Sequence, residues 1–351
     1  MNALKHAAVA LALTCTALGC SAPMKSTPSA FLSRTFEPSA RAGEALVAKP
    51  SPPEPSPPEP TVLPSDLRSC ALASTVGPPI MERSDATTAK RVALTFDDGP
   101  HVSYTPGVLD ALKAHQQKAT FFLVGRAING RTFHLVQRTL AEGHSLGIHS
   151  YNHEVEMATH FGAEKSEAYI VGQYEVTRML IELAWVATSE TDFDAQYTRV
   201  FGVAPYAWIS EEMLATQRDA FAARHAEVLS ERGFSAGTHP VDVVFWRPPG
   251  GGPYLGKEGG IARKTYDAAL RSLGAINVIW HGGSGDTDAH RRHDKSFLLG
   301  NLRHAARQGG VLLLHDPIDK VALRTGLAQL KTDGVEVVSL ETLAREKFGC
   351  P

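Results

Sequence analysis

Residues 95–100 read Thr-Phe-Asp-Asp-Gly-Pro and close an apolar run that begins at residue 91. The run has the length and composition of a buried strand, and the Gly-Pro pair ends it. Successive side chains of a strand point to opposite faces, so we expect Asp97 and Asp98 to do different work. One carboxylate can hold a metal while the other stays free as a base. An isolated Asp-Asp-Gly, by contrast, is more often a turn or a helix cap.

Residues 149–153 read His-Ser-Tyr-Asn-His and follow a second apolar stretch, residues 145–148. Histidines four residues apart can meet on one side of a helical turn. Two imidazoles and one carboxylate make three protein ligands, the number in a catalytic zinc site that keeps its fourth position open. The spacing alone is weak evidence, because two surface histidines often show it. The distance in sequence between residues 95–100 and residues 149–153 is that expected between neighbouring strand ends in a parallel sheet or barrel.

Two further segments end in chemically useful residues. Residues 243–246 lead into Arg247 and a Pro/Gly loop over residues 248–253, and residues 309–314 lead into His315. Taken singly, the loop would be a turn and His315 a core or loop histidine. Together the four strand ends bring Asp, His, Arg and His to one rim, which predicts a single site there.

These motifs resemble those of the polysaccharide deacetylases with NodB homology, carbohydrate esterase family four, over roughly residues 89 to 345. The resemblance implies an α/β fold, a distorted (β/α) barrel of seven or eight strands with the site at the strand carboxyl ends. It implies that Asp97 is the general base, that Arg247 orients it and that His315 is the general acid. It also implies a divalent metal, Zn²⁺ with Co²⁺ or Ni²⁺ as alternatives, whose ligands would be Asp98, His149 and His153.

The same roles follow from the chemistry of deacetylation, which transfers an acyl group from nitrogen to water. A metal would polarise the carbonyl and acidify the water, and Asp97 would accept the proton. Arg247 would keep Asp97 ionised. The tetrahedral oxyanion needs a nearby donor, for which the backbone N–H of Gly250 is our candidate. A protonated His315 would supply the amine leaving group with its proton.

The fourth family motif, Trp-x-x-Asp-x-x-Asp-Trp, matches only in part. Trp280 and Asp286 align with it, whereas Gly283 stands at the first Asp and Thr287 at the closing Trp. We expect Asp286 to hold His315, and Trp280 and Leu313 to belong to the substrate side of the site. The missing tryptophan ordinarily lines the acetyl pocket, which leaves acetyl specificity and rate open.

Composition and the amino-terminal segment indicate an exported enzyme. The chain has 351 residues, 43% of them hydrophobic, and a net charge of -2 that gives no sign of a nucleic-acid partner. Residues 1–20 resemble a lipoprotein signal peptide that would leave Cys20 lipidated, and an ordinary secretory signal is the alternative. Residues 21–88, with a proline-rich repeat at residues 51–60, predict a disordered tether. We therefore expect a protein lipid-anchored to a bacterial membrane and facing the periplasm or exterior.

Two cysteines remain outside the signal segment, Cys70 and Cys350. They flank the barrel, whose first and last strands are neighbours, and an oxidising compartment would favour a bridge between them. The sequence thus predicts a Cys70–Cys350 disulfide.

The catalytic domain is expected over residues 89–350, with residues 154–242 as an enlarged helical insertion. Amphipathic spacing predicts two helices in the insertion, over residues 166–185 and 211–233. The insertion could wall the substrate groove or only stabilise the fold. Helices of the barrel are predicted over residues 104–116, 133–143, 264–273, 297–308 and 319–333, and further strands over residues 119–124, 277–280 and 335–340.

We predict a monomeric, metal-dependent hydrolase that removes N-acetyl groups from an envelope or extracellular polysaccharide. Peptidoglycan, a chitin-like polymer and an exopolysaccharide are the candidate substrates. An O-acetyl polysaccharide esterase is one alternative, since the same site can attack either acyl bond. A non-catalytic glycan-binding lipoprotein is another, although binding alone would not require Asp97, Arg247 and His315 together.

Overall fold

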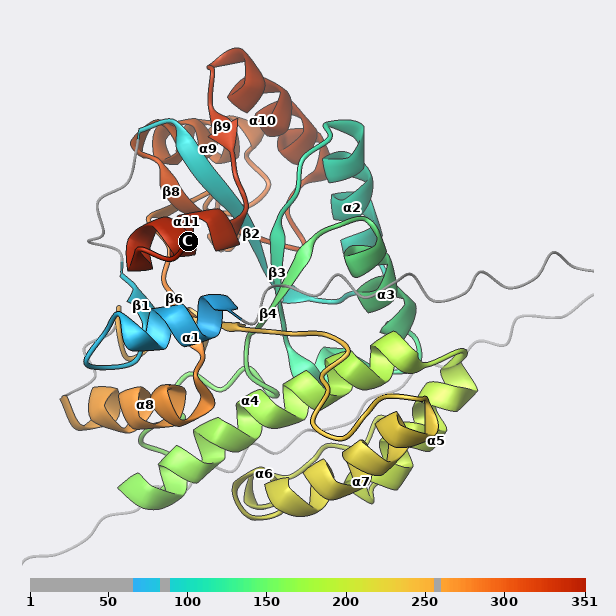
Figure 1. The fold of residues 1–351 in the computed structure, drawn as a ribbon. Coiled ribbons are helices and arrows are strands. Elements are labelled where there is room, and N and C mark those ends of the chain that lie inside the picture. Colours follow the sequence, from blue (N-terminus) through green and yellow to red (C-terminus); the bar gives the residue numbers. More distant parts are fainter. Residues whose placement is uncertain (1–65, 83–88, 256–259) are drawn as a thin grey trace, which may run out of the picture. The chain divides into compact units, whose positions relative to one another are not determined.

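The computed structural model describes residues 66–82, 89–255 and 260–351 (Figure 1). The strands are β1 (Ile80–Met81), β2 (Arg91–Gly99), β3 (Thr120–Leu123), β4 (Ser145–Ile148), β5 (Phe245–Trp246), β6 (Ile276–Val278), β7 (Gly282–Gly283), β8 (Gly310–His315) and β9 (Glu336–Val337). The α-helices are α1 (Asp66–Ala73), α2 (Thr105–Ala114), α3 (Phe133–Ala141), α4 (Ala163–Val186), α5 (Glu190–Phe201), α6 (Glu211–Thr216), α7 (Arg218–Glu231), α8 (Gly260–Leu273), α9 (Lys295–Gln308), α10 (Lys320–Thr332) and α11 (Leu340–Phe348). Two 3₁₀ turns, η1 (Gly125–Ala127) and η2 (Pro249–Gly251), follow β3 and β5.

The strands form one parallel sheet in the order β1-β6-β5-β4-β3-β2-β8-β7, with β9 paired to β2 beside this path. Helices connect most successive strands, as parallel pairing requires. The curled sheet is the distorted (β/α) barrel that the resemblance implied. Within the described residues, β1 and β7 at the two ends of the strand order do not pair, so the barrel is not fully closed. All strand carboxyl ends therefore lie at one rim.

The two faces of the sheet are buried by different helices. On β2, Val92, Leu94 and Phe96 face the large core formed with the surrounding helices, whereas Ala93 faces a second core inside the curl. Helices α1 and α11 fill that inner core with Leu67, Ala71, Leu340, Ala344 and Phe348. The period of two places Thr95 and Asp97 on the inner face too, above this apolar plug.

The insertion is helical, as predicted, and is built around α4, which contacts α3, α5, α6, α7 and α8 (Figure 1). Its first predicted helix corresponds to α4. The second is divided at Gln217 into α6 and α7, and α5 was not predicted. Ser189 caps α5 by accepting a hydrogen bond from the N–H of Asp192, a local signal of a helix start.

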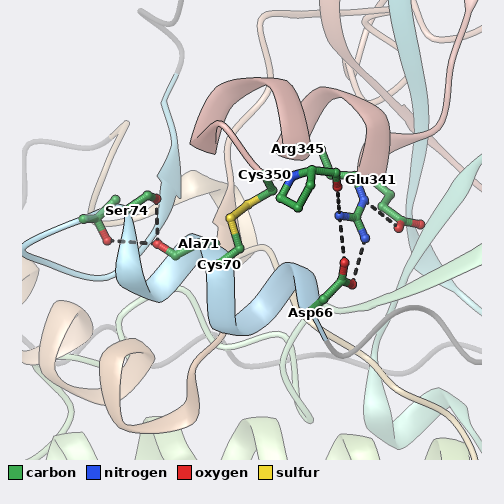
Figure 2. The surroundings of a disulfide bond; sticks show 9 residues. Asp66, Cys70, Ala71, Ser74, Glu341, Arg345 and Cys350 are labelled. Carbon is green, nitrogen blue, oxygen red and sulfur yellow. Dashed lines mark hydrogen bonds and ion pairs between the residues drawn. A yellow bond between two sulfur atoms is a disulfide. The ribbon is translucent and has the colours of Figure 1, made fainter.

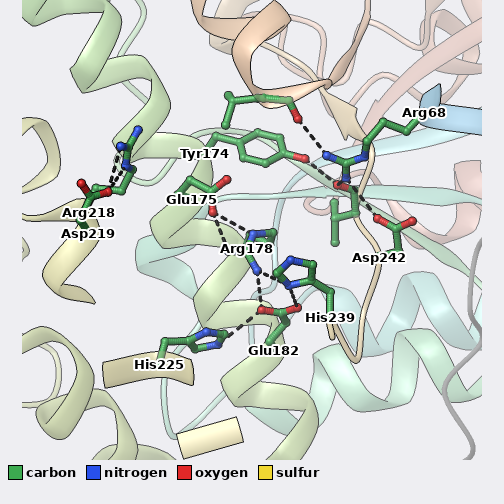
Figure 3. Close-up of polar contacts among 12 residues, drawn as sticks. Arg68, Tyr174, Glu175, Arg178, Glu182, Arg218, Asp219, His225, His239 and Asp242 are labelled. Atoms are coloured by element: carbon green, nitrogen blue, oxygen red, sulfur yellow. Dashed lines mark hydrogen bonds and ion pairs between the residues drawn. The ribbon is translucent and has the colours of Figure 1, made fainter. Parts of the chain in front are cut away.

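A buried ion-pair cluster joins α4 to the end of the insertion (Figure 3). Glu182 is fully buried and lies 2.7 Å from Arg178 and 3.0 Å from His239. Burial, followed by the charge of Arg178, lowers the pKa of the neighbouring His225 to about 3. His225 is therefore neutral, and Arg178 is the counterion that a buried carboxylate needs.

Helix α1 and strand β1 lie in the segment predicted as a disordered tether, so residues 66–82 belong to the folded domain. Arg68 of α1 donates to the carbonyl oxygens of Leu273 and Val243 and pairs with Asp242 at 3.1 Å (Figure 3). The phenol of Tyr174 donates to the same Val243 carbonyl. These contacts hold the segment that enters β5 and ends at Arg247. The tether prediction was wrong here because a two-residue strand has no periodicity to detect.

The structure joins Cys70 and Cys350, the pair expected to bridge, in a disulfide with an S–S distance of 2.07 Å (Figure 2). They meet because α1 packs against α11, beside the ion pair between Asp66 and Arg345. The adjacency of the first and last predicted strands, on which the expectation rested, is also observed, since β2 pairs with β9.

Removing this bridge should destabilise the domain. The cysteines are 280 residues apart in sequence, and a bridge that closes so long a loop stabilises the fold by about 5 kcal/mol through its restriction of the unfolded chain. We expect the double variant Cys70→Ser/Cys350→Ser to lose about this much free energy of unfolding, measured by urea denaturation. Dithiothreitol should lower the midpoint of the parent and leave the variant unchanged. Equal midpoints for the parent with and without reductant would contradict a stabilising bridge.

Several predictions fall on residues that the structure does not describe. The signal peptide of residues 1–20, the lipidated Cys20 and the tether over residues 21–65 and 83–88 lie outside the described ranges. Within those ranges, no helix has both the length and the apolar character needed to cross a bilayer.

Candidate active site

Strand register brings the inner-face residues of four strands to the same rim. Asp97 on β2 lies directly opposite His315 on β8, and Ile148 at the end of β4 lies opposite Trp246 on β5. The next residues, His149 and Arg247, therefore leave their strands side by side. The rim thus receives a carboxylate, two imidazoles and a guanidinium from strands β2, β4, β5 and β8, as the sequence predicted.

Asp97 is held by Arg247, and both side chains are buried, with 2% and 0% of their surfaces exposed. One Nη of Arg247 donates to Asp97 Oδ1 at 2.7 Å and to the hydroxyl of Thr95 at 2.8 Å, and its Nε donates to the carbonyl of Val278. The guanidinium also lies over the ring of Phe122, 4.1 Å from its centroid. Burial lowers the pKa of Arg247 and Asp97 opposes that change. The carboxylate is consequently fixed beside a permanent charge.

Thr95 is a site residue that the sequence argument missed. It lies two positions before Asp97 on the inner face, so the period of two could have found it.

Asp98 leaves the strand through an irregularity between Asp97 and Gly99, with φ at 73°. A bulge of this kind re-aims a side chain, and the Asp98 carboxylate lies 3.6 Å from His149 Nε2 and 3.2 Å from His153 Nε2. Burial raises the pKa of Asp98, but the hydrogen bond and charges of the histidines outweigh burial and bring that pKa to about 2. Both neighbouring carboxylates therefore face one site.

Asp98, His149 and His153 present ligand atoms that all lie within 4.8 Å of one another. His149 Nδ1 donates to the carbonyl oxygen of Arg247 at 2.7 Å, which leaves its Nε2 pointing at Asp98. Burial lowers the pKa of His149, so the imidazole is neutral, as a metal ligand must be. One carboxylate and two imidazoles, one of them fixed through its second nitrogen, fit a divalent metal such as zinc.

His149 and His153 were expected to lie on one helical turn, but the structure shows no helix there. The backbone turns irregularly after β4, with φ at 63° for Ser150 and 61° for His153, and the N–H of His153 donates to the Ser150 hydroxyl. Gln173 of α4, fully buried, accepts from the N–H groups of Tyr151 and Asn152. The insertion thus supports the ligand loop, a role that an isolated glutamine in a helix does not reveal.

His315 is held by Asp286, as predicted. Asp286 accepts from the backbone N–H of His315 and lies 2.8 Å from its Nδ1. Burial lowers the pKa of His315, but the hydrogen bond and charge of Asp286 outweigh it, and the net pKa is raised. The imidazole therefore stays protonated to higher pH, with Nε2 left for the site.

The remaining candidates lie around this centre. Gly250 follows Arg247 in η2 with φ at 63°, a conformation that favours glycine. Trp280 is half-buried, with Arg247 5.8 Å from its ring centroid. Leu313 lies two residues before His315, opposite Gly283. A Cβ at Gly283 would lie 2.9 Å from the Leu313 carbonyl oxygen, so close pairing of β7 with β8 accounts for glycine where the family pattern has Asp. Thr287 is exposed.

A second group of possible metal ligands, Glu154, His160 and Glu211, lies in the insertion. His160 Nε2 and Glu211 are already paired at 2.6 Å. This ion pair accounts for the proximity of His160 and Glu211, and we assign no ion to the group.

A parallel barrel whose rim carries an Asp-His-His ligand set, an arginine-held carboxylate and a carboxylate-held histidine has the layout of a metal-assisted hydrolase. The family model described as polysaccharide deacetylase matches residues 84–189. A chitooligosaccharide deacetylase of Sinorhizobium fredii is 30% identical over 65% of this chain and 90% of its own length. The chain belongs to the polysaccharide deacetylase family.

Other relatives carry related names. The peptidoglycan-N-acetylglucosamine deacetylase PgdA of Listeria monocytogenes is 28% identical over 79% of this chain, and the match spans 43% of that protein's length. Among solved structures, a CE4 esterase of Streptococcus mutans is 22% identical, with a TM-score of 0.49 over 74% of this chain and 87% of that one.

Proposed function

We propose that this protein hydrolyses N-acetyl groups of N-acetylglucosamine residues in an envelope polysaccharide. The observation that carries the proposal is the register of Asp97 with His315, which brings a carboxylate and an imidazole to the same rim as the Asp98, His149 and His153 donor set. The names of the peptidoglycan and chitooligosaccharide deacetylases support this substrate class.

Asp98, His149 and His153 would hold the metal, Zn²⁺ or alternatively Co²⁺ or Ni²⁺. When bound, such an ion polarises the acyl carbonyl and lowers the pKa of the attacking water. Asp97 is placed to take the proton of that water, since Arg247 fixes its Oδ1 and leaves its Oδ2 3.6 Å from His149. The backbone N–H of Gly250 would donate to the oxyanion, and Trp280 and Leu313 would border the acyl group.

Breakdown of the tetrahedral adduct breaks the carbon–nitrogen bond and frees acetate. The departing nitrogen needs a proton, which His315 Nε2 can give while Asp286 holds its Nδ1. Asp97 accepts one proton and His315 donates one, so the pair returns to its starting state when they exchange protons with solvent.

The direct test is acetate release from peptidoglycan, chitooligosaccharides and O-acetylated xylan by the metal-loaded protein. We expect release from the first two, lost on chelation and restored by Zn²⁺ or Co²⁺. Release from xylan alone would identify an O-acetyl esterase. Glycan binding with no acetate release from any substrate would identify a binding protein.

Asp286→Asn should shift the alkaline limb of the pH profile of kcat to lower pH. Asp286 raises the pKa of His315, and the acid must be protonated to act. Without that charge the imidazole loses its proton at lower pH, so activity falls earlier as pH rises. Profiles of parent and variant between pH 5 and 10, with Asp219→Asn as a surface control, measure the shift. An unmoved alkaline limb would exclude His315 as the acid.

We also propose that the protein is exported and lipid-anchored through Cys20. The sequence of residues 17–20 supports this proposal. Cys20→Ala should move the protein from the membrane fraction to the soluble fraction of the envelope, detected by immunoblotting after fractionation. An unchanged distribution would indicate an ordinary secretory signal or a different anchor.

A further inference from the structure

An exposed tryptophan is held beside the active-site rim by the insertion. Trp208 lies between α5 and α6 and has 65% of its surface exposed. The carbonyl of the residue before it, Ala207, accepts from the Tyr197 phenol at 2.8 Å, and the N–H of the residue after it, Ile209, donates to the Tyr151 phenol at 3.0 Å. Both phenols belong to buried residues. The backbone on each side of the exposed indole is therefore fixed.

The same contacts attach Trp208 to the catalytic rim. Tyr151 belongs to the loop that carries His149 and His153. The segment after β3 is bonded to both motifs, since the N–H of Val124 donates to the Gly99 carbonyl and the N–H of Gly125 to the Ser150 carbonyl. Arg126 follows directly, and its own N–H donates to the Tyr151 carbonyl. Arg126 and Trp208 are therefore both attached through Tyr151 to the loop that carries the proposed metal ligands.

Arg126 and Trp208 are stacked, with the guanidinium carbon 4.8 Å from the ring centroid. Arg126 is exposed, and within the described residues its side chain has no ion pair or hydrogen bond beyond this contact. By comparison, the hydroxyl of the nearby Tyr206 already donates a hydrogen bond to Glu190. An arginine with no acidic partner attracts a carboxylate, for which its planar fork is suited.

A small cavity of about 80 Å³ adjoins this pair. Its lining includes the side chains of Asn129, Asp194 and Tyr206 beside Arg126 and Trp208. An aromatic face offers apolar contact at low conformational cost, and the Asp194 carboxylate can accept from hydroxyl groups. The Asn129 amide already donates to the Ala127 carbonyl and accepts from the N–H of Arg131. This combination of groups suits a sugar ring that bears an acidic substituent.

We propose that Trp208 and Arg126 form a subsite for a carboxylate-bearing sugar next to the residue that is deacetylated. This inference rests on the proposed function and narrows its substrate to an acidic glycan. Trp208 packs against the sugar ring, and Arg126 pairs with the carboxylate. The insertion is then a specificity element as well as a support for the ligand loop.

Binding to the metal-loaded, full-length Asp97→Asn protein separates recognition from turnover. The probes are neutral chitotetraose, a peptidoglycan tetrasaccharide with lactyl carboxylates and a hyaluronan tetrasaccharide with uronate carboxylates. We expect the acidic probe with the correctly placed carboxylate to bind about tenfold more tightly than chitotetraose, measured by calorimetry. The acidic probe that binds more tightly than chitotetraose identifies whether the carboxylate is lactyl or uronate. Equal affinity for all three would overturn the proposal.

Two variants assign the roles, each added to Asp97→Asn. Arg126→Gln should abolish the preference for the acidic probe and retain binding of chitotetraose. Trp208→Ala should weaken every probe by about tenfold or more, and Trp208→Phe should restore part of the loss. Arg218→Gln, an exposed arginine elsewhere in the insertion, is the matched control. An unchanged preference in Arg126→Gln, or unchanged affinities in Trp208→Ala with the same Tm, would refute the subsite.

Failure of the subsite and failure of the proposed function would give different results in these experiments. Acetate release by the parent with no effect of either variant on binding would refute the subsite alone. Variant effects on binding without acetate release by the parent would refute the deacetylase and keep the subsite.

Discussion

Asp97→Asn should lower kcat/KM for acetate release by about a thousandfold, because the amide cannot accept the proton of the attacking water. The amide oxygen can still accept from Arg247, whose Nη lies 2.7 Å from Asp97 Oδ1, so the side chain should keep its position. Asp97 is outside the proposed ligand set, and metal content per chain should stay at the parental value. Acetate release and elemental analysis of the same preparation measure both quantities.

The matched control is Asp219→Asn, since Asp219 is an exposed aspartate on α7 that pairs with Arg218. It should retain parental activity. Activity of Asp97→Asn within tenfold of the parent, with metal content unchanged, would exclude Asp97 as the general base. Loss of metal together with activity would instead place Asp97 among the ligands.

The strand ends could be found from the sequence because their signals are local. A buried strand shows as an apolar run, and Asp97, His149, Arg247 and His315 each follow one directly. Parallel pairing then brings them to one rim whatever lies between them. The alternation of side chains along β2, which puts Asp97 and Thr95 on the same inner face, could also be predicted from the sequence.

Other features depend on contacts that the sequence does not show. Gln173 has no distinguishing neighbours in sequence, and its importance comes from the ligand loop that packs against α4. Strand β1 has two residues and is defined only by its pairing with β6. Residues 335–340 were predicted as one strand, but β9 ends at Val337 and Ser339 caps α11 by accepting from the N–H of Thr342. The conformation of residues 149–153 likewise depends on Gln173 and Arg247.

Arg247→Met should reduce the free energy of unfolding by about 4 kcal/mol, because it leaves Asp97 as a buried carboxylate without its counterion. The pair has 0% and 2% of its surfaces exposed. Methionine fills much of the volume but cannot donate to Thr95 or to the Val278 carbonyl, as Arg247 does. Urea denaturation measures the loss. Arg218→Met, which breaks an exposed pair, should change stability by no more than about 0.5 kcal/mol.

The double variant Arg247→Met/Asp97→Asn tests the cause of the loss. If the penalty comes from the unpaired charge, removing that charge should recover about half of it, so the double variant should be more stable than Arg247→Met alone. If the loss came only from packing around Arg247, adding Asp97→Asn would leave stability the same or lower. The double variant should stay inactive, because it lacks the proposed base Asp97. Recovery of its stability would therefore show that the loss in Arg247→Met comes from a carboxylate left without its counterion inside the barrel, and that the pair is kept for its position in the site rather than replaced by neutral groups.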